Sequence, residues 1–140
     1  MKNLKQITLL TLALGASNVQ AGVIPSDITP LESLGFCASF FQAVIKDEPS
    51  DEVKQVAKTF VDKYVDEVTT AYPKMEDTKR HIEGVKRIVK REVAYIESIT
   101  EDIADEKAKF NFNYDYGYQL GKECVEKHLP KLPTTEEYDL

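Results

Sequence analysis

The sequence is poor in the residues that most enzymes and metal sites use, with no tryptophan, two cysteines and two histidines among 140 residues. Thr78, not glutamate, lies three residues before His81. Val125 takes the same place before His128, so the E-x-x-H signature of di-iron bundles is missing. No C-x-x-C-H, H-E-x-x-H, G-x-S-x-G or phosphate-binding glycine loop occurs. We therefore predict no metal, no cofactor and no catalytic residues, and we expect the chain not to be an enzyme.

The chain also lacks an excess of basic residues and a long apolar run. Its formal net charge is −6, which argues against general nucleic-acid binding, because such binding needs a basic surface. The apolar run from Ile7 to Leu14 is far shorter than the ~20 residues that a transmembrane helix needs, and no later segment is apolar enough. We therefore expect no nucleic-acid partner and no stable insertion into a membrane.

Residues 1–21 have the features of a secretory signal peptide. Lys2 and Lys5 form a positive start, an apolar stretch follows, and small residues precede an expected cleavage site after Ala21. An uncleaved anchor is the alternative. The mature chain, 22–140, would carry a net charge of −8, because the leader removes two lysines and no acids. These features predict a periplasmic or secreted protein.

Two segments early in the mature chain predict α-helices. Thr29, Pro30 and Glu32 combine an N-cap threonine, a proline at the first helical position and a capping-box glutamate. The apolar stripe of this first helix comprises Leu34, Cys37, Ala38, Phe41, Val44 and Ile45. Ser50 caps a second helix, which ends at Tyr72 because the residue before a proline resists helical geometry. The apolar face of the second helix comprises Val53, Val56, Ala57, Phe60, Val61, Tyr64, Val65 and Val68.

The third predicted helix is the longest. Its apolar stripe comprises Ile82, Val85, Val89, Val93, Ile96, Ile99 and Ile103. Many of these residues are β-branched, which favours strands in isolation, but the helical period overrides that preference. Together with a fourth helix, these segments predict an all-α domain over residues 22–129, a small three- to four-helix bundle. Residues 130–140, which contain two prolines and three acids before the final leucine, are expected to form a disordered acidic tail.

The stretch FNFNYDYGYQLGKEC, which begins at position 110, has an aromatic residue at every second place before two glycines and a cysteine. A strand would put the aromatics on one face, but glycines weaken a strand and no second strand pattern exists to pair with it. We favour a helix from about Tyr114 to His128, with residues 110–113 as the turn that leads into it. Its seam of small residues comprises Gly117, Gly121 and Cys124.

The two cysteines predict a disulfide. An exported protein with only two cysteines most simply pairs them, so Cys37 and Cys124 would join the first and last helices. The bond requires Cα atoms within about 7 Å, closer than most helix pairs approach. The glycine seam would permit that approach. A redox-active pair is not expected, because no C-x-x-C motif is present.

Four carboxylates near the end of the third predicted helix form two pairs at spacing i, i+4. They are Glu101, Asp102, Asp105 and Glu106. Such pairs could hold calcium, but the glycine and the regular ligand spacing of a calcium loop are missing. We interpret the four residues as a solvated acidic face.

The exposed face of the third helix is predicted to be basic in its first half. Its candidate partner-binding residues are Lys79, Arg80, Lys86, Arg87, Lys90 and Arg91. The next stretch, from Glu92 to Glu106, contains no basic residue. Two such faces laid antiparallel would match in charge, so a two-fold homodimer is one hypothesis and an anionic partner is another. An ordinary solvated face with internal pairs, such as Glu83 with Arg87, is the third.

The aromatic stretch supplies a second candidate surface. Tyr114 and Tyr118 are the preferred exposed, partner-binding pair, because tyrosine offers contact area with little loss of entropy. Tyr116 and Phe112 are expected to fill the core. The leading functional hypothesis is an exported, non-catalytic protein-binding factor, for example an inhibitor or immunity-type protein with a partner in the cell envelope or outside the cell. A carrier or chaperone for apolar cargo is the alternative.

Overall fold

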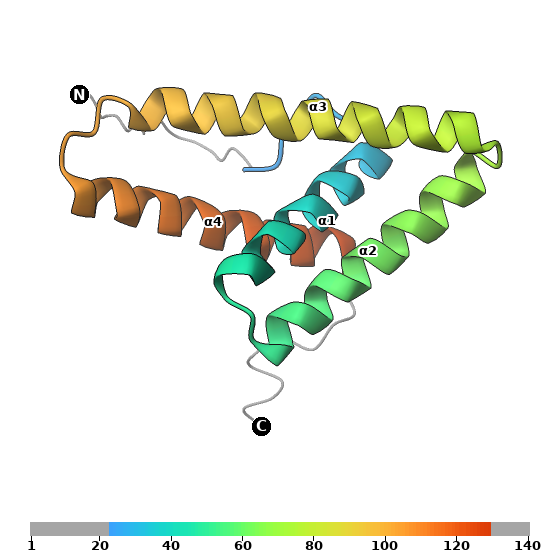
Figure 1. The fold of residues 1–140 in the computed structure, drawn as a ribbon, viewed down its shortest axis with the longest axis horizontal. Coiled ribbons are helices and arrows are strands. Elements are labelled where there is room, and N and C mark those ends of the chain that lie inside the picture. The colour runs from blue at the N-terminus through green and yellow to red at the C-terminus, as the bar shows by residue number, and fades with distance from the viewer. Residues whose placement is uncertain (1–22, 130–140) are drawn as a thin grey trace.

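The fold consists of four α-helices in the part of the chain that the computed structural model describes, residues 23–129 (Figure 1). The helices are α1 (Pro30–Asp47), α2 (Asp51–Ala71), α3 (Met75–Thr100) and α4 (Glu106–His128). No strand occurs between residues 23 and 129, which confirms the predicted all-α class. The predicted signal peptide, 1–21, and the predicted tail, 130–140, lie outside the described residues.

α1 is the central helix, and the other three helices pack around it (Figure 1). The predicted capping box fixes its start: the Thr29 hydroxyl accepts from the Glu32 amide at 3.1 Å, and the Glu32 carboxylate accepts from the Thr29 amide at 2.9 Å. Every residue of segment 33–38 is buried, because α2, α3 and α4 all contact this helix. Of the predicted apolar stripe, Val44 and Ile45 near the end of the helix are only half-buried.

Gly35 lies where α1, α2 and α3 come together. A Cβ atom at this position would lie 2.7 Å from Cε1 of Tyr64 on α2 and 2.9 Å from Cγ2 of Val85 on α3. Both distances are shorter than a carbon–carbon contact allows, so only glycine fits without displacement of these side chains. The close approach buries Tyr64 and Val85, which hold the first half of α3 against the core.

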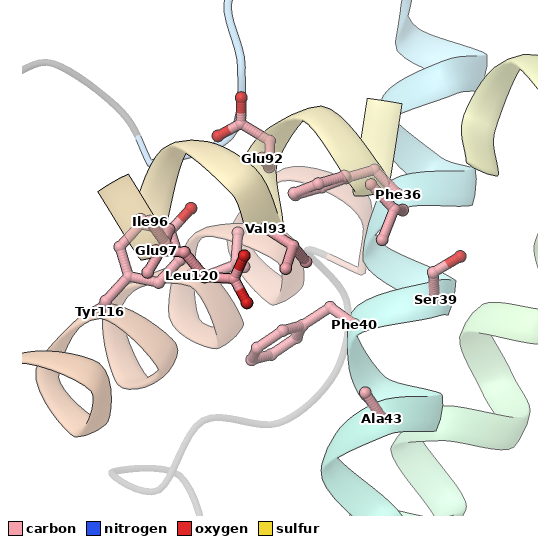
Figure 2. Close-up of a pocket in the computed structure, with 11 residues that line it drawn as sticks. Phe36, Ser39, Phe40, Ala43, Glu92, Val93, Ile96, Glu97, Tyr116 and Leu120 are labelled. Atoms are coloured by element: carbon pink, nitrogen blue, oxygen red, sulfur yellow. The ribbon is translucent and has the colours of Figure 1, made fainter. Parts of the chain in front are cut away.

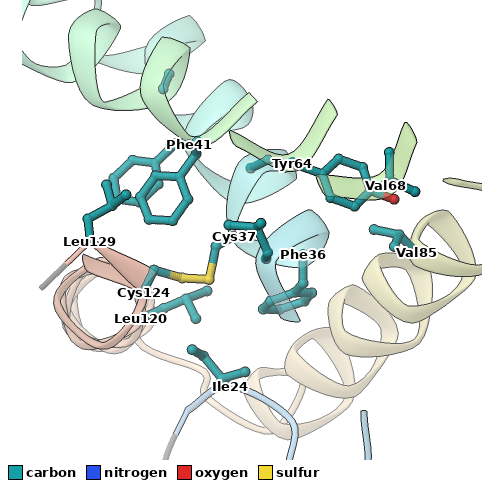
Figure 3. Packing of buried hydrophobic residues seen from close by; sticks show 14 residues of the cluster. Ile24, Phe36, Cys37, Phe41, Tyr64, Val68, Val85, Leu120, Cys124 and Leu129 are labelled. Carbon is teal, nitrogen blue, oxygen red and sulfur yellow. A yellow bond between two sulfur atoms is a disulfide. The ribbon is translucent and has the colours of Figure 1, made fainter. Parts of the chain in front are cut away.

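The core fills the space between α1, α2 and α4 (Figure 3). Phe41 of α1 stacks on Phe60 of α2, with ring centroids 5.0 Å apart. Ile24, which precedes α1, and Leu129, which follows α4, are both buried in the same cluster. The segment before α1 is also held by Glu123, whose carboxylate accepts from the amides of residues 23 and 24 at 2.8 and 2.9 Å. Both ends of the described chain are therefore tied to the core.

The predicted disulfide is present and joins the first and last helices. Cys37 and Cys124 are fully buried, and their Cα atoms are 5.7 Å apart (Figure 3). The glycine seam is half correct: a Cβ at Gly121 would lie 3.4 Å from the Phe40 ring of α1, but one at Gly117 would meet nothing within 4 Å. Gly121 therefore lies against α1, whereas Gly117 faces open space.

The predicted boundaries of the last two helices are wrong. α3 ends at Thr100 and not beyond Ile103, and α4 begins at Glu106 instead of about Tyr114, so residues 110–113 are helical and not a turn. The reason is a cap that the prediction missed. The Asp105 side chain accepts from the amide of residue 108 at 3.2 Å, and an acid follows in the first turn, where the helix dipole favours it.

This cap also changes the interpretation of the four nearby carboxylates. They do not form i, i+4 pairs on one helix, because the connection between α3 and α4 separates them. Glu101 caps the end of α3, Asp102 lies in the connection, Asp105 caps α4 and Glu106 begins it. All four are exposed, as the prediction of a solvated acidic surface requires.

Candidate functional site

All six predicted basic residues of α3 are exposed, but half of them form ion pairs. Arg80 pairs with Asp77 at 2.8 Å, Lys86 pairs with Glu83 at 3.4 Å, and Arg91 pairs with Asp27 at 3.0 Å. Glu83 therefore pairs with Lys86 and not with Arg87 as predicted. Lys79, Arg87 and Lys90 form no ion pair with any residue between 23 and 129.

The Arg91 pair ties α3 to the segment before α1. Both guanidinium Nη atoms donate to the Asp27 carboxylate, each at 3.0 Å. This hydrogen bonding holds the pKa of Asp27 below its ordinary value. Because Asp105 and Glu106 belong to α4, the acidic half of α3 is shorter than predicted. The antiparallel homodimer hypothesis thus loses much of the acidic face on which it depended.

The aromatic residues of α4 divide between its two sides. Tyr114 and Tyr118 are 59% and 62% exposed, as expected, and Phe110 is 66% exposed one turn earlier. The rings of Phe110 and Tyr114 lie in a stacked arrangement with centroids 6.3 Å apart. Phe112 and Tyr116 are half-buried, and Tyr116 packs against the core, where burial raises its pKa. The exposed rings of Phe110, Tyr114 and Tyr118 form a row that nothing in the described chain covers.

An apolar groove, which the sequence prediction missed, lies between α1, α3 and α4 (Figure 2). α1 contributes Phe36 and Phe40, α3 contributes Val89, Val93 and Ile96, and α4 contributes Tyr116 and Leu120. The groove is open on one side, has a volume of about 260 Å³ and has an almost entirely apolar surface. It is the space that remains where three helices meet without filling the angle between them.

The groove exists because α3 is longer than α1, the helix on which it packs. α3 has 26 residues and α1 has 18, which correspond to lengths of about 39 and 27 Å. α3 contacts α1 and α2 through its first half, around Val85, whereas α4 contacts α1 through Leu120 and Cys124. α3 and α4 make almost no direct backbone contact with each other. They therefore diverge from α1, and their joined ends extend past the core (Figure 1).

Two glutamates line the groove, and one of them directs its carboxylate into the mouth. Glu97 directs its carboxylate towards the space between Val93 and Phe40, whereas Glu92 points away from it (Figure 2). Glu92 is half-buried, and this burial raises its pKa, although neighbouring Arg91 opposes the shift. No lysine or arginine lines the groove. The site is thus apolar with an acidic edge.

Both histidines form hydrogen bonds at helix junctions. His81 Nδ1 is 2.8 Å from the Tyr64 hydroxyl, which links α3 to α2, and burial lowers the pKa of His81. His128 Nε2 is 2.8 Å from the hydroxyl of Ser33, a fully buried residue of α1. Burial also lowers the pKa of His128, which favours the neutral imidazole. The hydrogen bond of His128 to Ser33 therefore links the end of α4 to α1.

No group of three or more histidine, cysteine, aspartate or glutamate side chains between residues 23 and 129 could hold a metal ion. None of the four helices combines the length and the apolar character that a membrane crossing demands. The chain matches no protein family, no curated protein and no solved structure. The class that remains is an all-α, four-helix domain with a disulfide between its first and last helices, and such a bond is compatible with an extracytoplasmic location.

Proposed function

We propose that the chain is an exported, non-catalytic protein-binding factor. The observation that carries this proposal is the concentration of exposed apolar side chains on the α3–α4 arm, which we define as residues 93–118. Six of the nine large hydrophobic residues that are exposed in the described chain belong to this arm. They are Val93, Tyr95, Ile99, Phe110, Tyr114 and Tyr118.

The fold does not require these apolar side chains to be exposed to water, and their exposure is unfavourable. Single exposed apolar residues are ordinary, but a contiguous group marks an interaction site, and on the arm the row of Phe110, Tyr114 and Tyr118 is such a group. Tyrosine is enriched at such sites, because its ring provides contact area and its hydroxyl remains hydrated. The arm also extends away from the core, so a partner can reach it without disturbing the helices around α1.

The remaining polar groups support binding over catalysis. His81 and His128 each bond to a neighbouring helix, and both cysteines are in the disulfide, so these groups stabilise the structure. The net charge of −6 suits a basic partner. An inhibitor or immunity-type factor that blocks a basic extracytoplasmic protein is the form of this function that we favour.

A pull-down from an extracytoplasmic extract tests the proposal, with the full oxidised chain as bait. The native chain should retain a stoichiometric partner, and the double variant Tyr114→Ser/Tyr118→Ser should lose it. Val65→Ser/Met75→Ser, which removes two exposed apolar residues outside the arm, is the matched control and should retain the partner. A triple charge reversal at Lys86, Arg87 and Lys90 tests the basic face separately. Retention by all variants would refute the assignment to the arm.

A carrier for apolar cargo is the second candidate. The groove volume of about 260 Å³ favours it, because this is close to the lower end of pockets that hold small ligands. A carrier should take up an environment-sensitive apolar dye while its circular dichroism spectrum stays that of the folded chain. Absence of dye uptake by the folded chain would rule out this candidate.

A further inference from the structure

We infer that the groove between α3 and α4 is a docking site for a basic amphipathic helix of a partner protein. The inference rests on the proposed protein-binding function and specifies the chemistry of the partner. It follows from three properties of the groove: its apolar spacing, the type of backbone that surrounds it and the charge of its edge.

The spacing of the apolar residues matches two turns of a docked helix. Val89, Val93 and Ile96 follow each other at four and three residues along α3, over about 10 Å. A helix that lies beside them presents its own side chains at i, i+4 and i+7 over the same length. Phe40 of α1 and Leu120 of α4 also line the groove, so the docked helix would contact all three helices.

The backbone around the groove favours a helix over an extended segment. All three walls are α-helices, whose amide and carbonyl groups are already hydrogen-bonded within the helix. An extended peptide gains main-chain hydrogen bonds only at a sheet edge, and none exists among residues 23–129. A helix satisfies its own backbone and adds apolar contact, with interaxial distances of about 8–10 Å.

The charge around the groove determines the sign of the partner. The residues that line the groove include two glutamates, Glu92 and Glu97, and no lysine or arginine. Glu97 lies at the mouth, and the acids of the α3–α4 connection lie at the far end of the arm. Lysine or arginine residues that flank the apolar face of a docked helix would therefore be attracted, whereas an acidic helix would be repelled.

A titration with two synthetic peptides tests the inference on the full oxidised chain. One is an amphipathic peptide of about 15 leucines and lysines, long enough to form a helix, and the other has glutamate in place of every lysine. Isothermal titration calorimetry at low salt should show binding of the leucine–lysine peptide at least about tenfold tighter than of the leucine–glutamate peptide. Added salt should reduce this difference, because salt screens exposed charges.

Two substitutions with matched controls locate the site. Val93→Gln should weaken the leucine–lysine peptide by about tenfold through lost apolar contact, and Val65→Gln on α2 should leave it unchanged. Glu97→Lys should weaken binding of the same peptide by about three- to tenfold and strengthen binding of the leucine–glutamate peptide. Glu126→Lys, which makes the same change of charge away from the groove, is the matched control and should do neither. Because Val93, Glu97 and both control residues are exposed, all four variants should fold.

Equal binding of the two peptides, or binding that Val93→Gln leaves unchanged, would overturn the inference. So would a homodimer that Val93→Gln dissociates in analytical ultracentrifugation, because a second copy would then occupy the groove. Uptake of an apolar dye without peptide binding would assign the groove to small cargo instead. Capture of a partner in the pull-down that Val93→Gln does not reduce would leave the proposed function standing and refute only the docking site. Peptide binding as expected without any captured partner would refute only the proposed function.

Discussion

Removal of the disulfide by Cys37→Ala/Cys124→Ala should destabilise the protein more than any surface substitution. The bond closes a loop with a sequence separation of 87 residues. In the chain-entropy model, a loop of this length restricts the unfolded chain by about 4.5 kcal/mol at 25 °C. Because both cysteines are fully buried, lost packing adds to this loss. A small domain is typically stable by about 5–15 kcal/mol, so the variant should lose a third or more of its free energy of unfolding.

Urea and thermal unfolding, each followed by far-ultraviolet circular dichroism, measure the effect. The melting temperature should fall by about 15–20 °C, and the denaturant slope should rise, because the unfolded variant exposes more surface than the cross-linked unfolded chain. Native protein with its disulfide reduced is the control and should match the variant to within about 1 kcal/mol. If both proteins lost less than about 1.5 kcal/mol of unfolding free energy, the argument would be refuted. The disulfide would then restrict the unfolded chain far less than the chain-entropy model requires.

Three further tests, two of them with a matched control substitution, address other junctions by urea unfolding. Gly35→Ala should destabilise the protein by about 1–3 kcal/mol, since its Cβ would lie only 2.7 Å from the Tyr64 ring. Gly117→Ala, at a position that faces open space, should stabilise it by about 0.5–1 kcal/mol. Effects of the same sign would contradict the packing described around the two glycines. Burial lowers the pKa of His128, so the unfolded chain takes up the proton more readily and stability should fall as the pH drops below about 6.5. His128→Gln should reduce that fall between about pH 7.5 and 5.5, and an unchanged slope would contradict the sign. Glu123→Ala should cost about 1–3 kcal/mol and speed hydrogen exchange at the amides of residues 23 and 24, while Glu126→Ala, an exposed neighbour, should do neither.

The sequence predicted features whose causes are local. Thr29 and Ser50 cap their helices as expected, because a cap depends on residues within one turn. The disulfide was predictable, since two cysteines permit a single pairing within the chain. The start of α4 was equally local but was missed. Asp105, which caps it, also continued the apparent pattern of the preceding helix, and an acidic first turn after a short connection was the signal that could have found it.

Features that depend on how helices meet could not be predicted. Nothing around Gly35 in the sequence indicates that residues 29 and 50 positions later will lie against it. The partners of His81 and His128, a tyrosine and a serine, are equally remote. The groove was missed for the same reason: a helical period shows that a helix has an apolar face, but it does not show which other element covers that face.

The α3 stripe makes this last point most clearly. The same spacing that identified the helix continues through Val93 and Ile99, which are 52% and 39% exposed, because the α3 residues that pack on the core lie earlier in the helix. β-Branched residues lower helix propensity by several tenths of a kcal/mol each relative to alanine, and on a covered face burial offsets that cost. On the arm, Val93 and Ile99 receive little of that burial from the described elements. The apolar stripe therefore extends beyond the chain's own core, and a helix that docks between α3 and α4 would provide the missing contact.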